Sequence, residues 1–384
     1  MKEFNYKRCS KGMWDTTISD ISFDNDGVSN YCKMQESLMN MYPLGEKGKR
    51  DWELLVNKII KAGKGKRYDC IIGVSGGTDS SYLLHIAKQY GLNPLAVNLD
   101  NGWSSDISVK NIKKVTGKLG IDLETYVIDY DEVKIVLKSY ILAGLPWVDS
   151  PTDIAIKATL YMIAAREGIS YIMNGADFRS EGKQPLNWTY SDSRQMNFLV
   201  KKFFKKKLKT FPYLRLSGLL FYGLIKRIKN IRPLYFLPYN KTTARELLEK
   251  QYGWEYYGGH HHENVFTKFI ITYWLPKKFN IDKRIITLSA QVLAGNLKRE
   301  DALIQLSLPS YNQEQVGKDI LYVTKKLDLS MQEFNNAIVN ENHYFYDYPS
   351  YYRIIKKFNK IGKYLSLKIF DFKPGIFEAI DQSI

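Results

Sequence analysis

The chain has 384 residues, 45% of them hydrophobic, which suffices for one large or two moderate domains with a hydrophobic core. The longest apolar run, residues 216–225, is too short to cross a bilayer, and the first residues lack the apolar segment of a signal peptide. Its three cysteines are too few for a disulfide framework, which favours a reducing compartment. These features predict a cytoplasmic protein and argue against membrane-spanning and disulfide-rich secreted classes.

The charge balance is strongly basic, with 56 Lys or Arg, 40 Asp or Glu and a net charge of +16. A surplus of this size indicates an anionic partner: a nucleotide, a nucleotide-sugar, a nucleic acid or an anionic lipid. Part of the charge lies in the run 201–209, where lysines surround Phe203 and Phe204. The alternative for this run is a solvated helix face beside two buried aromatic rings.

In chain order, residues 1–50 are polar and turn-rich, and we expect an irregular N-terminal segment, similar to a degenerate zinc ribbon. A helical pattern begins at Asp51, and short apolar segments then alternate with helical ones. The predicted strands are 68–74, 95–99, 123–128 and 171–174, and the predicted helices are 80–90, 108–119, 132–142 and 151–166.

This alternation predicts an α/β fold, with a parallel Rossmann-like sheet covered by helices on both faces. Ligands bind such sheets at the carboxyl ends of the strands, near the point where the strand order reverses. Those ends carry Ser75, Asp100, Asn174 and Gly175. We therefore assign residues 51–180 to a nucleotide-binding domain.

Beyond residue 180 aromatic residues become dense and the pattern is mostly helical. Residues 181–384 are therefore predicted to form a mostly helical region that binds substrate or a partner. Its helices are expected at 241–252, 264–275, 298–306, 313–327 and 352–364.

The segment Ser75-Gly76-Gly77-Thr78-Asp79-Ser80 lies between a predicted strand and a predicted helix. The glycines let the backbone turn sharply and bring N–H groups close to phosphate oxygens, and the hydroxyls add further donors. The helix that follows directs its positive end at the anion. The segment has neither the Gly-Lys-Ser/Thr ending of P-loop NTPases nor a Gly-x-Gly-x-x-Gly pattern. It predicts a pyrophosphate-binding loop.

A carboxylate in such a loop repels phosphate unless a divalent cation lies between them. Mg²⁺ is the expected ion, because it binds few protein carboxylates and several phosphate oxygens. Asp79 is the first predicted ligand, and Asp100 is a second metal or nucleotide contact. Asp100-Asn101-Gly102 also reads as an ordinary turn, which is the alternative.

Ser-Gly-Gly-x-Asp-Ser after an apolar strand resembles the loop of the PP-loop ATP pyrophosphatases. That superfamily includes asparagine, GMP and NAD synthetases and tRNA thiolation enzymes. The resemblance implies that ATP is split at its α-phosphate while the loop, residues 75–80, holds the pyrophosphate.

Further segments resemble the N-acetyl sugar amidotransferase family of bacterial O-antigen and lipopolysaccharide biosynthesis. They keep their order from about residue 9 to 310. The matching segments are 13–17, 21–24, 100–103, 151–156, 174–178, 238–241, 257–264, 267–269, 275–279 and 281–284.

This resemblance implies an ATP-dependent ligase that converts the N-acetyl group of a UDP-linked sugar into an acetamidino group. The amide oxygen attacks the α-phosphate, pyrophosphate leaves, and ammonia displaces AMP from the adenylated imidate. No cysteine lies in a Gly-x-Cys-x-Gly elbow. Ammonia is therefore expected from a separate glutaminase with a synthase-like partner subunit.

The segment 257–264 carries most of the expected site chemistry. His261, His262 and Glu263 are the predicted catalytic residues, with a histidine as the proton-transfer group. His260 and Asn264 are predicted to contact substrate, although they replace the usual lysine and serine of the family. Three adjacent imidazoles on a helix point about 100° apart, so they do not share one metal ion.

Three further residues are predicted substrate contacts: Thr152, Asp153 and Lys241. The first two alternatively cap the helix that begins there, and Lys241 alternatively lies on a solvated surface, as does Arg245.

The family often carries two Cys-x-x-Cys pairs near the N-terminus, but here Gly12 and Ser29 stand at two of those positions. Cys9 and Cys32 alone do not complete a zinc site, so no zinc is expected.

Two other functions stay open at this point. A tRNA-modifying pyrophosphatase would use the basic charge, but no complete zinc finger, RNA-binding module or catalytic cysteine pair is evident, which makes nucleic acid a less favoured partner. A non-catalytic nucleotide-binding assembly subunit is the other. The basic aromatic segment 201–230 is also a possible contact with the inner face of the membrane.

Overall fold

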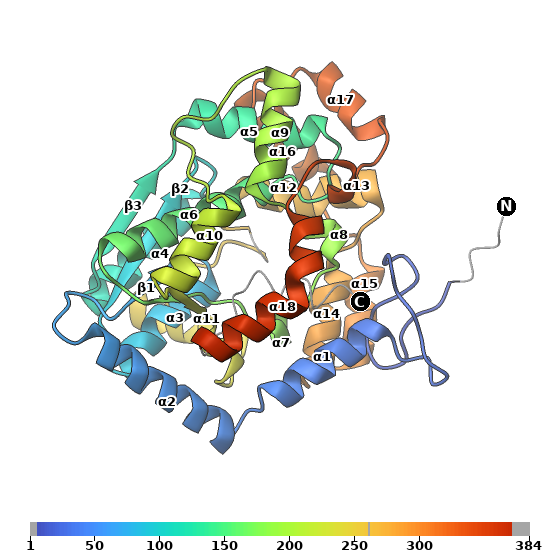
Figure 1. The fold of residues 1–384 in the computed structure, drawn as a ribbon. Coiled ribbons are helices and arrows are strands. Elements are labelled where there is room, and N and C mark those ends of the chain that lie inside the picture. Colours follow the sequence, from blue (N-terminus) through green and yellow to red (C-terminus); the bar gives the residue numbers. More distant parts are fainter. Residues whose placement is uncertain (1–5, 260–261, 371–384) are drawn as a thin grey trace.

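A computed structural model describes residues 6–259 and 262–370. Five strands form one sheet with the order β3-β2-β1-β4-β5, and every pairing is parallel. Helices surround this sheet (Figure 1). The predicted α/β class is confirmed. The strands are β1 (Cys70–Gly73), β2 (Pro94–Asp100), β3 (Leu123–Val127), β4 (Tyr171–Met173) and β5 (Lys229–Ile231).

Strand β5 comes from the region that the sequence predicts to be mostly helical. Its residues Lys229–Ile231 pair with Tyr171–Met173 of β4 at the edge of the sheet. The strand has only three residues, Lys-Asn-Ile, so no apolar run or alternation signals it. The sheet therefore takes a strand from beyond residue 180.

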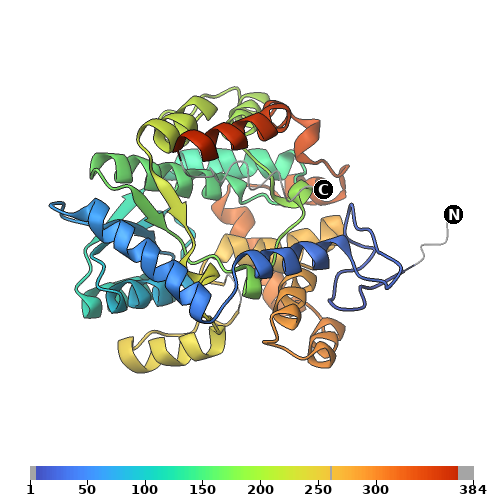
Figure 2. The same ribbon diagram turned by 60° about the horizontal axis from the view of Figure 1, so that its bottom comes forward.

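Both faces of the sheet are covered because alternate side chains of each strand point to opposite faces. On one face Cys70 and Ile72 of β1 pack in a core with α2 (Glu46–Gly63), α3 (Thr78–Gln89), α4 (Asp106–Leu119) and α11 (Lys241–Tyr252). On the other face Ile71 packs with Leu160 and Ile163 of α6 (Ser150–Arg166). Figure 2 shows the sheet between these layers.

The first 50 residues are more regular than the sequence predicts. Helix α1 spans Asn30–Met41, with Ser29 as a side-chain cap that accepts from the amide of Cys32. Its apolar residues are few and are separated by polar ones, so the helical periodicity of hydrophobic residues is weak. Residues 6–29, by contrast, form no helix or strand.

The remaining helices form the C-terminal half together with α5. Their largest buried cluster joins Trp14 near the N-terminus with Phe269, Trp274 and Phe334. The N-terminal segment is thus part of the C-terminal core. These helices are α5 (Tyr130–Leu142), α7 (Phe178–Glu181), α8 (Leu186–Thr189), α9 (Ser193–Phe204), α10 (Leu216–Leu220), α12 (Val265–Phe269), α13 (Leu275–Phe279), α14 (Arg284–Leu293), α15 (Arg299–Ser307), α16 (Gln313–Lys326), α17 (Met331–Val339) and α18 (Tyr352–Phe370), with π-helical turns at Phe221–Ile225 and Ile270–Trp274 and 3₁₀ turns at Pro233–Tyr235 and Phe345–Asp347.

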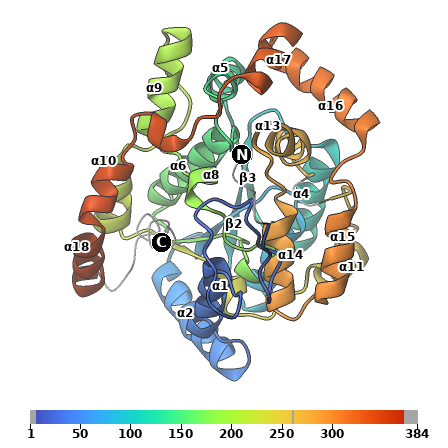
Figure 3. The same cartoon turned by 90° about the vertical axis from the view of Figure 1, so that its right-hand side faces the viewer.

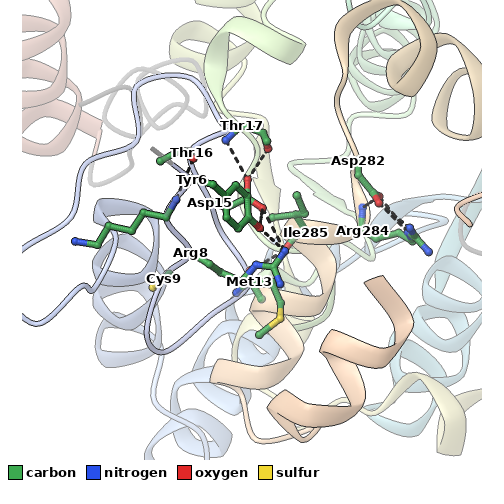
Figure 4. Close-up of polar contacts among 12 residues, drawn as sticks. Tyr6, Arg8, Cys9, Met13, Asp15, Thr16, Thr17, Asp282, Arg284 and Ile285 are labelled. Atoms are coloured by element: carbon green, nitrogen blue, oxygen red, sulfur yellow. Dashed lines mark hydrogen bonds and ion pairs between the residues drawn. The ribbon is translucent and has the colours of Figure 1, made fainter. Parts of the chain in front are cut away.

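Polar contacts organise the N-terminal segment and hold it against α14 (Figure 4). The Asp15 carboxylate accepts from Tyr6 Oη at 2.8 Å and from the Thr17 amide at 3.0 Å. It also forms an ion pair with Arg8 at 3.5 Å. The amide of Met13 donates to Ser289 Oγ of α14 at 2.8 Å. These bonds fix a chain segment that has little secondary structure of its own.

Cys9 and Cys32 are both buried within this segment, and the Cys9 sulfur accepts from the Ser29 amide at 3.2 Å. Hydrogen bonding, first of all from Cys32, lowers the pKa of the Cys9 thiol to about 4. Across residues 6–259 and 262–370, no three His, Cys, Asp or Glu side chains gather as metal ligands. In that same part of the chain, no helix combines the length and the hydropathy needed to span a bilayer.

Candidate active site

A cavity opens at the carboxyl ends of β1, β2 and β4, where the strand order of the sheet reverses. Ser75 follows β1, Asn101 follows β2 and Asn174 follows β4, and all three line the cavity. Helix α6 forms one wall through Thr152 and Ile156, and residues 263–264 close another side. The predicted convergence of strand ends is therefore present, and it creates a space for a ligand.

The loop at Ser75–Ser80 turns sharply at Gly76, which has a φ of +78°. A β-carbon at this position would lie 2.2 Å from the carbonyl oxygen of Ser108, so only glycine fits here. The amide of Gly77 donates to Ser75 Oγ at 3.3 Å, and the amide of Ser75 donates to Ser80 Oγ at 3.3 Å. These bonds keep the turn compact and bring its backbone N–H groups together.

Helix α3 begins at Thr78, two residues before the predicted start. Thr78 and Asp79 therefore lie in its first turn, where the helix dipole and the unpaired amides favour an anion. The Thr78 amide donates to the hydroxyl of Tyr257 at 3.2 Å, and Trp254 Nε1 donates to the carbonyl of Gly76 at 3.0 Å. Two aromatic side chains from the C-terminal half thus support the loop. The sequence of the loop itself does not indicate these contacts.

The Asp79 carboxylate is held by two residues that follow β5. Tyr239 Oη donates to Oδ1, and Lys241 Nζ donates to Oδ2 at 3.0 Å. Burial lowers the pKa of Lys241, but the interactions with Asp79, Glu181 and Tyr257 together outweigh it, and the net pKa is raised. Lys241 is therefore a cation beside the loop, paired with Asp79 although its side chain is still partly exposed.

These contacts bear on the expected Mg²⁺. A cation ligated by Asp79 would have to replace the ammonium group of Lys241, which already neutralises that carboxylate. In this arrangement the Asp79 carboxylate is paired with Tyr239 and Lys241 rather than open to a metal ion. Asp100 forms the turn that was its alternative: its Oδ1 accepts from the Gly102 amide at 2.8 Å. Metal binding at Asp79 and Asp100, and nucleotide binding by Asp100, stay predictions.

The segment 263–265 runs antiparallel to residues 103–105 just after β2. The amide of Ser105 donates to the carbonyl of Glu263 at 2.8 Å, and the amide of Val265 donates to the carbonyl of Trp103 at 2.9 Å. This pairing places the Glu263 carboxylate beside the loop. A β-carbon at Gly77 would lie only 3.1 Å from its Oε1. Of the predicted catalytic residues, Glu263 thus lies beside the loop that contains Asp79.

The other predicted residues have different surroundings. His260 and His261 lie outside the described residues, whereas the imidazole of His262 packs over Gly259. Asn264 caps α12 by accepting from the Thr267 amide at 3.0 Å, and it also lines the cavity. Gly175 packs against the backbone of Asp79, where a β-carbon would come within 2.8 Å.

The predicted pair on α6 divides its roles. Thr152 lines the cavity and accepts from Asn101 Nδ2 at 3.0 Å. Asp153 accepts from Trp147 Nε1 at 3.1 Å. Helix α6 begins at Ser150, and its N-cap residue, Asp149, makes no capping bond. The pair therefore lies in the first turn rather than at the cap position.

Two buried charged groups near this turn were missed by sequence reasoning. Asp149 is 5% exposed, and its Oδ2 accepts from Thr267 Oγ1 at 2.6 Å, while its Oδ1 has no hydrogen-bond partner among the described residues. Burial, with the nearby Asp153 carboxylate, raises the pKa of Asp149 to about 7. Lys283 is 4% exposed, lies 4.3 Å from the Trp147 ring centroid, and has its pKa lowered by burial to about 8.

Both groups can exchange a proton near neutral pH, which distinguishes them from ordinary carboxylates and ammonium groups. Asp149 lies in no motif, and Lys283 lies in the matching segment 281–284, which by itself assigns it no role. The burial that shifts both pKa values is not evident from the local sequence.

The sheet topology, the loop and the cavity together define a nucleotide-binding α/β protein of the PP-loop type. The C-terminal part can be assigned more closely: residues 263–361 match the family described as "LPS biosynthesis protein WbpG-like, C-terminal domain". This match supports the resemblance to the sugar amidotransferases of lipopolysaccharide biosynthesis. It begins at Glu263, the residue whose carboxylate lies beside the loop.

A curated relative covers a smaller part. Over 98 residues the chain is 32% identical to an uncharacterized protein of Methanocaldococcus jannaschii. The match covers 25% of this chain and 35% of the relative, so it spans about a third of that protein's length.

Solved structures that resemble the chain share little of its overall geometry. A predicted tRNA methyltransferase subunit from Methanocaldococcus jannaschii is 20% identical with a TM-score of 0.26, and the matched region covers 47% of this chain and 75% of that one. The U34-tRNA thiolase NcsA from Methanococcus maripaludis, solved with its [4Fe-4S] cluster, is 17% identical with a TM-score of 0.32 and coverages of 66% and 82%. NMN synthetase from Francisella tularensis is 14% identical with a TM-score of 0.28 and coverages of 48% and 97%.

Proposed function

We propose that this protein is an ATP-dependent amidotransferase of O-antigen and lipopolysaccharide biosynthesis. It converts the N-acetyl group of a UDP-linked sugar into an acetamidino group, releasing pyrophosphate and AMP. Ammonia comes from a partner glutaminase with a synthase-like subunit.

One observation carries the proposal. The first residues of the WbpG-like domain, Glu263 and Asn264, line the same cavity as Ser75 of the loop. A loop that binds pyrophosphate and a domain found in lipopolysaccharide biosynthesis thus meet at one site. The sugar amide and the α-phosphate have to meet in the same way during adenylation.

The residues around the cavity suit the first half of the reaction. The positive end of the α3 dipole and the ammonium of Lys241 would stabilise charge that develops on the leaving pyrophosphate. A neutral amide oxygen is a weak nucleophile, so adenylation depends on this stabilisation. As the oxygen–phosphorus bond forms, the bond from the α-phosphorus to pyrophosphate breaks.

The second half of the reaction releases a proton. When ammonia attacks the imidate carbon and AMP leaves, the nitrogen that has been added gives up one proton to form the amidinium product. The carboxylate of Glu263, one of the predicted catalytic residues, lines the cavity and would accept it.

The direct test uses the purified protein with ATP, Mg²⁺, ammonium and a panel of UDP-N-acetyl sugars. The expected result is sugar-dependent AMP and a product lighter by about one mass unit, because NH replaces oxygen. AMP formation with none of the sugars would reject the proposal. AMP formation that depends on tRNA would favour the modifying pyrophosphatase, and pyrophosphate release without any acceptor would favour a different substrate.

A further inference from the structure

The excess of basic over acidic residues in this chain lies in two stretches. Residues 201–232 contain eleven Lys or Arg and no Asp or Glu, and α18, Tyr352–Phe370, contains six and none. The rest of the chain has 39 basic and 40 acidic residues. The net charge of +16 therefore comes from these two stretches.

The two stretches lie side by side although they are more than a hundred residues apart. Ile355 of α18 is buried in a small cluster with Leu216 of α10 and with Tyr351 and Tyr352. Figures 2 and 3 both show α18 along α10, and in Figure 3 the two helices lie with α9 at one edge of the molecule. The fold thus brings α18 and the part of the first stretch around α10 to a single edge.

The same edge exposes large apolar side chains. On α18, Ile354, Phe358 and Ile361 are 43%, 52% and 59% exposed, and their spacing of four and three residues places them in one stripe. The π-helical turn after α10 exposes two more, since Phe221 and Ile225 are 45% and 68% exposed.

Lysines flank these apolar side chains. Lys226 Nζ lies 5.8 Å from the Phe221 ring centroid, and Lys357 Nζ lies 5.9 Å from the Phe358 ring centroid. In this arrangement an ammonium group can reach a phosphate headgroup while the ring beside it enters the acyl boundary.

We propose that the edge formed by α10, the turn Phe221–Ile225 and α18 docks the protein on an anionic lipid bilayer surface. Nucleic acid would explain the lysines but would leave the aliphatic side chains of Ile225, Ile354 and Ile361 in water. An acidic bilayer surface accepts both, because basic groups pair with its headgroups and apolar groups bury between them. This surface is separate from the cavity, so the inference does not depend on the proposed reaction.

The test measures co-sedimentation of the full chain with vesicles of phosphatidylglycerol and phosphatidylcholine, compared with phosphatidylcholine alone. We expect binding to the anionic vesicles that weakens as salt increases. The double variant F358S/I361S should bind these vesicles with an affinity at least about tenfold lower, because it lacks two large apolar side chains that would leave water on binding. The matched control is L321S/V339S, which changes two apolar residues that are 63% and 78% exposed on α16 and α17.

A second measurement separates insertion from simple charge attraction. An environment-sensitive fluorophore on I361C should shift to the blue with anionic vesicles, whereas the same label on V339C should not. The native cysteines Cys9, Cys32 and Cys70 are buried, so labelling is directed to the introduced residue.

Four outcomes would overturn the inference. The first is absence of binding to anionic vesicles by the unaltered protein. The second is equal binding by F358S/I361S and by the control variant, and the third is a dimer in solution that F358S/I361S abolishes. RNA binding that survives F358S/I361S, without vesicle binding, would also count against it. None of these outcomes bears on whether the protein forms AMP, so the proposed reaction is tested independently.

Discussion

Lys241 is the residue on which the charge balance of the loop depends. It follows β5 in sequence, yet its ammonium group lies 3.0 Å from Asp79 Oδ2 in the first turn of α3. The same carboxylate accepts from Tyr239. A motif that looks acidic in sequence is therefore neutralised within the fold, which is the condition for binding pyrophosphate next to a carboxylate.

Substitution K241Q should lower the rate of AMP formation by roughly 10²–10³-fold, because removing one preformed charge-stabilising donor typically has this effect. The midpoint of thermal unfolding should change little, since Lys241 is partly exposed and Gln keeps a donor. The matched control is K250Q on the exposed face of the same helix, α11, which should keep full activity. A less than threefold loss in K241Q would show that this cation does not act on the nucleotide.

Asp149 should make stability depend on pH. Its pKa rises from the ordinary 3.8 to about 7, first through burial and then through Asp153. The fold therefore binds its proton more tightly than the unfolded chain does, and stability falls as pH rises from about 4 to about 7. The difference corresponds to ~4 kcal/mol.

The substitution D149N removes this titration. Denaturant unfolding between pH 4 and pH 7 should show a smaller loss of stability for D149N than for the unaltered protein. D301N, which changes an exposed aspartate on α15, should follow the unaltered protein. Parallel curves for all three proteins would contradict the assignment.

At the scale of elements, the turn between β1 and α3 depends on how closely two helices approach. Gly76 has a φ of +78° and also lies against the backbone of Ser108 in α4, whereas Gly65 has almost the same φ, +77°, and open space around it. The two positions therefore separate the effect of backbone conformation from the effect of contact.

Both G76A and G65A place an alanine in the left-handed region, which costs about 1 kcal/mol. G76A also forces a β-carbon against a carbonyl oxygen, so α3 and α4 have to separate. We expect G76A to lose several kcal/mol of unfolding free energy and all AMP formation, and G65A to lose about 1 kcal/mol with normal activity. Equal stability of the two variants in urea unfolding would be inconsistent with the close approach.

At the scale of the whole molecule, the N-terminal segment is built into the C-terminal half. Trp14 is 1% exposed and belongs to the same buried cluster as Trp274 and Phe334. Met13 is tied to Ser289, which follows it by 276 positions. The N-terminal segment and the helices of the C-terminal half are thus expected to unfold together.

Substitution W14A should destabilise the protein by about 3–5 kcal/mol, as expected for a buried tryptophan. Because the core is shared, a probe near the N-terminus and one in α14 should report the same lowered midpoint in denaturant. L321A, which truncates an exposed residue of α16, should change neither. Separate midpoints for the two probes would show that the segment folds independently.

Local patterns were sufficient for the parallel sheet and for the loop. Short apolar runs separated by helical periods identified four of the five strands, and the glycines of Ser75–Ser80 identified the turn between β1 and α3. Both are visible in residue type and spacing over short stretches, although the strands themselves pair over long separations, as Ile71 does with Ile172. Strand β5 and helix α1 were not predicted. Lys229–Ile231 is too short and polar to show a strand periodicity, and the apolar positions of α1 are sparse.

The sequence by itself determined the fold class, the loop and the resemblance to a sugar amidotransferase, because these depend on residue type and local spacing. Only the tertiary structure decided that Lys241 and Tyr239 hold Asp79, that Asp149 and Lys283 are buried, and that two basic stretches share one edge. Those relations join residues far apart in the chain. Burial, which sets their charges and pKa values, arises only when the elements pack.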